Sequence, residues 1–118
     1  MKIINLTQHL PTPAQTAEGV FLASAELMAL LNFDDIPDIE DIEWRAAALA
    51  DIAVSEGAEA AMIGGAPYLM SALERALKAR GVKPLYAFSL RDSEDVLDEE
   101  TCVVKKTLVF KHLGFLEV

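Results

Sequence analysis

Short apolar segments alternate with amphipathic segments over most of the chain, and this alternation constrains the fold more than any other feature. Four segments are short and apolar, as buried strands are: residues 2–6, 20–23, 60–63 and 84–88. Apolar residues at helical spacing lie between them, in residues 24–31, 42–56 and 67–80. Parallel strands need long crossover connections, and helices usually supply them. The sequence therefore predicts an α/β fold with a mostly parallel sheet and helices on both faces.

Capping residues mark the ends of the predicted helices. Thr12 precedes Pro13, which suits an N-cap followed by proline at the first helical position, and Gln15 completes the capping-box spacing. That helix is expected to end near Gly19. Glycines stop the two longer helices just past residues 56 and 80. Residues 32–41 are acidic and contain a proline, so we expect a loop there.

The C-terminal part departs from the alternation. We expect a loop from Ser89 and a mobile polar connection over residues 92–100. Residues 102–110 and 112–118 carry strand-forming residues with no helix between them, which predicts an antiparallel addition to one edge of the sheet. Cys102 stands beside two valines and is expected to be a small buried side chain.

Length and composition favour a cytoplasmic protein with a single domain over residues 1–118. Apolar residues make up 53% of the chain, which is enough for a core, but no run is long enough to span a membrane. The N-terminus lacks the pattern of a signal peptide. Cys102 is the one cysteine, so no intrachain disulfide can form, as in reducing compartments. The net charge of -9 argues against binding of duplex DNA.

The charge is unevenly distributed along the sequence. Glu74 is the one acid between residues 60 and 91, against five bases: Arg75, Lys78, Arg80, Lys83 and Arg91. This segment could form a locally positive site on an acidic protein. It could equally form ordinary solvated faces.

Three loops leave the carboxyl ends of predicted parallel strands, where ligands of open α/β sheets bind. The loops hold Thr7, Gln8 and His9; then Gly64, Gly65, Ala66 and Pro67; then Ser89, Leu90 and Arg91. If the strands are neighbours, the loops should converge.

The turn at Gly64 and Gly65 is the strongest candidate for an anion site. Glycine lets a backbone approach a ligand, and the N-terminus of the following helix favours phosphate. Pro67 removes one donor, however, and the turn matches neither the Walker pattern nor the dinucleotide fingerprint. A tight strand-to-helix turn explains the glycines equally well. Tyr68 could stack on a base or cap the core.

His9 and Arg91 are the candidate catalytic residues. Histidine transfers protons near neutral pH, and a guanidinium can bind phosphate at two points. His112, beside Lys111, is expected to be structural or at the surface. The histidines and the cysteine lack metal-ligand spacing, and the acidic loop lacks the calcium-binding pattern, so we expect no metal and no cofactor.

Four stretches together resemble one family: residues 2–15, 62–69, 81–91 and 104–115. In their order and separation they are similar to the small CRISPR-associated ring nucleases, which are single-domain relatives of the CARF (CRISPR-associated Rossmann-fold) sensors. The resemblance implies a Rossmann-like, CARF-like fold and a homodimer that binds cyclic oligoadenylates. It also implies cleavage without metal, by attack of a ribose 2′-hydroxyl on the adjoining phosphate.

On this resemblance, His9 and Arg91 would take part in catalysis. The ligand-binding residues would be Gln8, Gly64, Gly65, Ala66, Tyr68 and Ser89. The chain departs from the family at Gly65, where these nucleases carry an acidic residue. Two other functions stay open. The protein could bind nucleotides without cleaving them, or it could be a small α/β interaction protein whose glycine turn is only a turn.

Overall fold

A mixed five-stranded sheet forms the centre of the protein. The computed structural model describes residues 1–23, 25–98 and 100–118, without the side chains of residues 91–96, 98 and 105–110. The strands are β1 (Ile3–Leu6), β2 (Val20–Leu22), β3 (Ala60–Ile63), β4 (Lys83–Asp98) and β5 (Val103–Glu117). Their order in the sheet is β2-β1-β3-β4-β5, in which β5 alone runs antiparallel to its neighbour. The predicted Rossmann-like α/β class, with its antiparallel C-terminal addition, is therefore confirmed.

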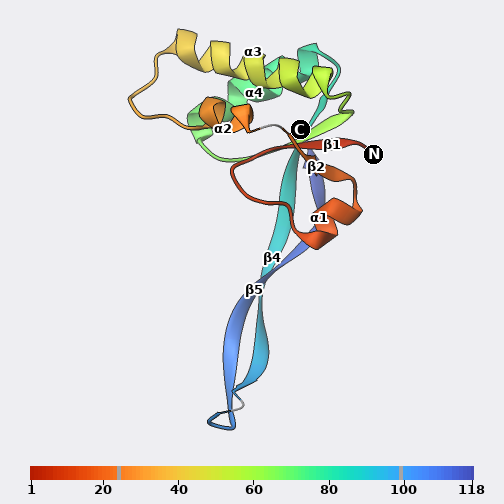
Figure 1. Ribbon diagram of the computed structural model, residues 1–118, viewed down its shortest axis with the longest axis vertical. Helices are drawn as coiled ribbons and strands as arrows, with labels where there is room; N and C mark the ends of the chain where they lie inside the picture. The colour runs from red at the N-terminus through yellow and green to blue at the C-terminus, as the bar shows by residue number, and fades with distance from the viewer. Residues whose placement is uncertain (24, 99) are drawn as a thin grey trace.

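Helices cover both faces of the sheet unequally (Figure 1). Three helices lie on one face: α2 (Glu26–Leu31), α3 (Ile39–Ser55) and α4 (Pro67–Ala79). The short α1 (Pro13–Ala17) lies on the other. Because side chains alternate along a strand, Ile4 and Leu6 enter the larger core beneath the three helices, while Ile3 enters a smaller cluster on the opposite face. None of the helices within the described residues is both long and apolar enough to cross a membrane.

Local capping sets the helix starts largely as predicted. The Thr12 hydroxyl accepts a hydrogen bond from the Gln15 amide at 3.2 Å, and the Gln15 side chain accepts one from the Thr12 amide at 3.0 Å, which confirms the capping box. Helix α3 begins at Ile39, three residues before the predicted start. The reason is that the Asp38 carboxylate accepts the Asp41 amide at 2.8 Å and so caps the extra turn.

Strands β4 and β5 differ most from the expectation. The loop predicted from Ser89 and the polar connection over residues 92–100 are wrong up to Asp98, since β4 continues through both. The two predicted C-terminal strands are one strand, β5. Cross-strand pairing explains the error, because a partner rich in β-branched and aromatic residues can hold acidic residues in a ladder against their own propensity. Only a register shift between Phe88 and Ser89 marks the expected loop.

The long β4–β5 hairpin projects from the body of the protein as an arm (Figure 1). The molecule measures 56 × 34 × 24 Å, and its radius of gyration is 17.1 Å, compared with about 13.5 Å for a compact chain of this length. Cys102 lies in the turn of the hairpin with a positive φ of 57° and is exposed, so the expectation of a buried thiol is wrong. A turn at the tip of the arm has no core beside it.

His112 joins the base of the arm to α1, as expected for a structural residue. Its side chain is 2% exposed, and its Nε2 lies 3.3 Å from a carboxylate oxygen of Glu18. The ring also contacts Phe115 edge-on, with centroids 4.9 Å apart.

Candidate functional site

A cavity of about 340 Å³ opens at the carboxyl ends of the central parallel strands. Leu6 of β1 pairs with Ile63 of β3, which in turn pairs with Tyr86 of β4, so the chain leaves β1 and β3 at the same height. The first two predicted loops therefore meet. The cavity is lined by Thr7, His9, Leu10, Thr12, Gln15, Met62, Ile63, Gly64, Tyr86 and Ala87.

The buried side chain of Asn5 holds the loop that carries His9. Asn5 Oδ1 accepts hydrogen bonds from the Thr7 amide at 3.0 Å and the Thr7 hydroxyl at 2.6 Å. Asn5 Nδ2 donates to the carbonyl of His9 at 2.8 Å. These bonds close the backbone into a tight turn and leave the His9 side chain exposed.

The glycine turn needs one of its two glycines for backbone geometry. Gly65 has φ +125°, a conformation that side chains with a Cβ rarely adopt. Gly64 has no such constraint, and a Cβ there would meet only the Thr7 Cγ2 at 3.8 Å. Within the described part of the chain, the amides of Gly65 and Ala66 make no backbone hydrogen bond. Gly64 lines the cavity, and the geometry of the turn does not require glycine there.

Tyr86 forms one wall of the cavity and is tied to α4. Its hydroxyl donates to a carboxylate oxygen of Glu74 at 3.0 Å. Burial of the ring, together with the hydrogen bond to Glu74 and its negative charge, raises the pKa of Tyr86 from 10.0 to about 12. The phenol is therefore neutral at physiological pH and cannot serve as a base there.

Gln8 is engaged with the protein itself rather than with the cavity at Gly64. Its side-chain amide donates to the Leu31 carbonyl at 3.3 Å and to the Asn32 side-chain oxygen, at the carboxyl end of α2. It lines an adjoining small hollow of about 120 Å³ beside β2 and α2, which shares Thr7, His9 and Leu10 with the cavity at Gly64. Gln8 thus fixes the end of a helix, a role that its position in a loop did not suggest.

Ala66 and Tyr68 also face away from the cavity at Gly64. Ala66 packs against the larger core. The Tyr68 ring meets Phe33 edge-on, with centroids 5.1 Å apart and planes at 76°. Tyr68 lines a second cavity, formed with the connection between α2 and α3. Through Phe33, which packs against the larger core, Tyr68 lies at the edge of that core, and its ring is half exposed.

Ser89 and Arg91 lie on the arm. Ser89 is exposed and pairs with His112 within the β4–β5 ladder. The backbone of Arg91 lies four positions past Ala87, the last residue of β4 that lines the cavity, which places it about 14 Å along the strand from the cavity wall. The side chain of Arg91 is outside the described residues. The third predicted loop therefore does not join the other two.

Acidic partners neutralise most of the bases that suggested a positive face. Arg75 lies 2.9 Å from Glu43, Arg80 lies 2.8 Å from Asp51, and Lys83 lies 3.9 Å from Glu117. The first two pairs join α4 to α3, on the helical face of the sheet. Among the described side chains that line the cavity at Gly64, none is lysine or arginine.

Sequence reasoning missed Asn5 and Tyr86 as contributors to the site. Asn5 is a polar residue in an otherwise apolar strand next to the strand end, and this contrast was a usable signal. The sequence carried no comparable signal for Tyr86, because aromatic residues are common in strands. No group of three or more potential metal ligands occurs among the described residues.

The fold and the cavity define an α/β protein with an open, mostly parallel sheet and a crevice at the carboxyl ends of its central strands. The chain belongs to the Uncharacterized protein MJ1673 family, whose family model matches residues 1–116. Comparisons with curated proteins and with solved structures find no match.

Proposed function

We propose that the protein binds cyclic oligoadenylates in the cytoplasm and cleaves them without a metal ion, as the resemblance to ring nucleases implies. The observation that carries the proposal is the shared cavity of Thr7, His9 and Gly64 at the carboxyl ends of adjacent parallel strands. This is where open α/β sheets bind nucleotides. The proposed ligand is a ring of adenylates, and its phosphates face the backbone at Gly64 and Gly65.

Each cleavage breaks one phosphodiester bond of the ring. The ribose 2′-oxygen attacks the adjoining phosphorus, and the 5′-oxygen of the next nucleotide leaves, so the products carry a 2′,3′-cyclic phosphate and a 5′-hydroxyl. One group removes the proton of the 2′-hydroxyl, and one group protonates the leaving oxygen. His9 is exposed on a loop fixed by Asn5 and takes one of these two roles. The protein's main contribution is to hold the attacking and leaving oxygens in line.

Positive charge for the phosphates comes, in this proposal, from Arg91 of a second copy. The backbone of Arg91 is too far along β4 to serve the cavity of its own chain. A homodimer in which the arm reaches the neighbouring copy would supply the guanidinium. The arm also exposes Phe88 (54%), Leu113 (57%) and Leu116 (59%) around a shallow apolar groove, a surface suited to burial against a partner.

Incubation with a panel of cyclic oligoadenylates in excess EDTA, followed by chromatography, tests the proposal. We expect linear products that end in a cyclic phosphate, with a rate about 10²- to 10⁴-fold lower in His9→Ala. A thermal shift on adding ligand should persist in that variant, because His9 acts in proton transfer. His112→Ala is not a suitable control, since His112 links β5 to α1. Lys78→Ala, on α4, offers a neutral control.

Binding without cleavage is the alternative supported by a specific observation. The cavity of this chain has Gly65 in the turn where ring nucleases carry an acidic residue. A nucleotide-binding protein would show the thermal shift but no product in any condition. A protein with neither response would act through protein contacts alone, and its glycine turn would serve only to reverse the chain.

A further inference from the structure

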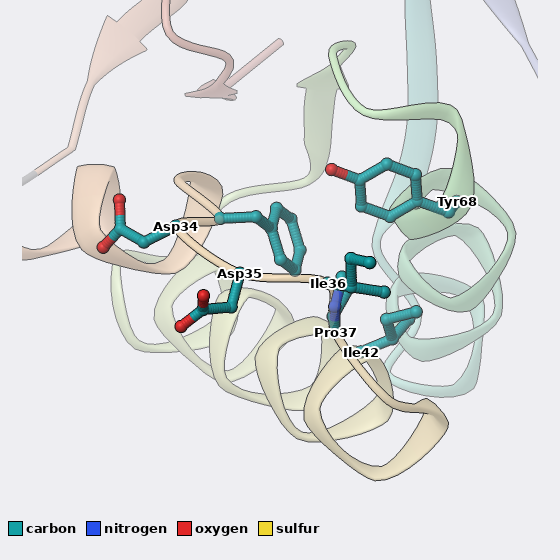
Figure 2. A pocket seen from close by; sticks show the side chains of 7 residues that line it. Asp34, Asp35, Ile36, Pro37, Ile42 and Tyr68 are labelled. Carbon is teal, nitrogen blue, oxygen red and sulfur yellow. The ribbon is translucent and has the colours of Figure 1, made fainter.

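A second and larger cavity, of about 640 Å³, lies beside the N-terminal end of α4 and is shown in Figure 2. It is formed by the connection between α2 and α3 together with Tyr68 at the start of α4. The side chains of Ile36, Ile42 and Tyr68 gather on one side, while the carboxylates of Asp34 and Asp35 lie on the other. This cavity is separate from the one that holds His9.

The apolar part of this cavity is strongly exposed. Of the apolar residues that line it, Ile36 is 99% exposed and Tyr68 52%, while Ile42 forms the buried floor. A large apolar side chain at a loop tip gains nothing from such exposure, and contiguous apolar patches of this kind mark interaction sites. Packing in the protein's own core therefore does not explain why an isoleucine occupies position 36.

One wall of the cavity is held firmly in place by Arg45. Its guanidinium lies 4.2 Å from the centre of the Phe33 ring and also donates to the carbonyls of Ala29 and Leu30 at 3.2 Å. Its Nε lies 3.1 Å from Asp41. The Phe33 ring, packed between Arg45 and Tyr68, is thus ordered before any partner arrives, which lowers the entropic cost of binding.

The charged side chains that line the cavity are both negative: Asp34 and Asp35. The one base in residues 34–59 is Arg45, which is already engaged with Asp41 and with backbone carbonyls. Asp38 caps α3 through the Asp41 amide, whereas Asp34 and Asp35 are exposed at the rim and form no hydrogen bond or ion pair with the described side chains. An anionic ligand would be repelled here, whereas lysine or arginine would be attracted.

We propose that this cavity is a docking site for a protein segment in which an apolar side chain is flanked by lysine or arginine. The apolar side chain enters between Ile36, Ile42 and Tyr68, and the flanking cations lie beside Asp34 and Asp35. Charge complementarity selects such a segment over another copy of this acidic chain. The proposal does not depend on the nucleotide site, because the two cavities share no lining residue.

A panel of short fluorescent peptides tests the proposal with the full chain. The peptides combine leucine or phenylalanine with lysine or arginine in all orders, and a matched panel carries glutamate in place of the cations. Fluorescence anisotropy should find binding in the first panel alone, and the binding should weaken as salt is added. Asp34→Asn with Asp35→Asn should weaken it about tenfold, and Ile36→Ser by at least as much.

Matched variants at the far end of α3 separate the site from general attraction. Glu56→Gln with Glu59→Gln removes the same charge, and Val54→Ser removes an apolar side chain that is 50% exposed. Both should bind as the unaltered chain does. The proposal is overturned if no basic peptide binds, if the glutamate panel binds equally, or if the distant variants weaken binding as much. Self-association that Ile36→Ser abolishes, without peptide binding, would instead assign the surface to a second copy.

Discussion

The side-chain amide of Asn5 donates to the backbone carbonyl of His9 at 2.8 Å, so a buried strand residue fixes the loop that holds the candidate catalytic histidine. Asn5 is only 4% exposed, and its oxygen accepts the Thr7 amide and hydroxyl as well. The strand thus determines where the histidine can be placed. In the proposed reaction, this anchor would supply the precise placement of His9 that in-line attack requires.

Asn5→Ala should uncouple the loop from the strand. Removing the side chain deletes the hydrogen bonds to the Thr7 amide, the Thr7 hydroxyl and the His9 carbonyl, which should lower the free energy of unfolding by about 1–3 kcal/mol. Turnover of cyclic oligoadenylate should fall at least about tenfold, because His9 loses its fixed position. Denaturant titration and product chromatography measure the two effects. Thr7→Ser keeps the hydroxyl and serves as the control; full turnover in Asn5→Ala would show that the anchor is irrelevant to the site.

The two glycines should respond differently to alanine. Gly65→Ala places a Cβ at φ +125° and should cost about 1–2 kcal/mol of stability whatever the function. Gly64→Ala meets only Thr7 Cγ2 at 3.8 Å, so its thermal midpoint should stay nearly unchanged. If phosphate approaches this backbone, Gly64→Ala should nevertheless weaken ligand binding about tenfold, as measured by calorimetry. Undiminished affinity would mean that the turn only reverses the chain.

The pKa of Tyr86 makes stability depend on pH in the alkaline range. Its folded pKa of about 12 lies above the value of 10.0 for an unperturbed tyrosine. The stabilisation is therefore fully present below pH 10.0 and is lost as pH rises toward about 12. Tyrosinate absorbance follows the titration directly. Glu74→Gln should lower the pKa only in part, because burial is the largest cause; an unchanged titration would disprove the contribution of Glu74.

Gln8→Ala should affect folding more than function. The side chain binds Leu31 and Asn32 at the end of α2, so its loss should cost about 0.5–1.5 kcal/mol. Turnover of ligand at saturating concentration should remain within about twofold of the unaltered chain, since Gln8 does not line the cavity at Gly64. Thermal melting and a rate measurement are sufficient. A large fall in turnover with normal stability would indicate that Gln8 contacts the ligand directly.

Self-association should depend on the base of the arm. Phe88→Ser removes a ring that is 54% exposed beside Leu113 and Leu116, and the proposed homodimer should dissociate at least about tenfold more readily. Sedimentation velocity over a range of concentrations measures this. Val54→Ser, on α3, removes comparable exposed apolar surface and should leave the assembly unchanged. A chain that sediments as a monomer throughout would contradict the dimer.

Dimer formation also predicts complementation between two inactive variants. A mixture of His9→Ala and Arg91→Ala chains should recover about a quarter of the activity if each site combines His9 of one copy with Arg91 of the other. Each variant alone should be inactive. Absence of recovery in a mixture that demonstrably forms dimers would place both residues in the same chain's site or remove Arg91 from it.

The sequence by itself determined the elements whose signals are local. The capping box at Thr12, the strand Ala60–Ile63 and the helix that begins at Pro67 follow from residues within a few positions of one another. The alternation of these elements was enough for the parallel sheet, because a crossover between parallel strands leaves few other arrangements. It was also enough to bring His9 and Gly64 to one edge.

Only the tertiary structure determined the partners of the remaining side chains and the full length of β4. Tyr68 turns to Phe33 and Gln8 to the end of α2 because their partners lie far away in the sequence, where no local pattern records them. The acidic residues after Ser89 suggested a loop, yet they form a strand because β5 pairs with them along their length up to Asp98. Strand pairing is a contact between distant segments, and the free energy of such contacts exceeds the weak preferences that a single segment expresses.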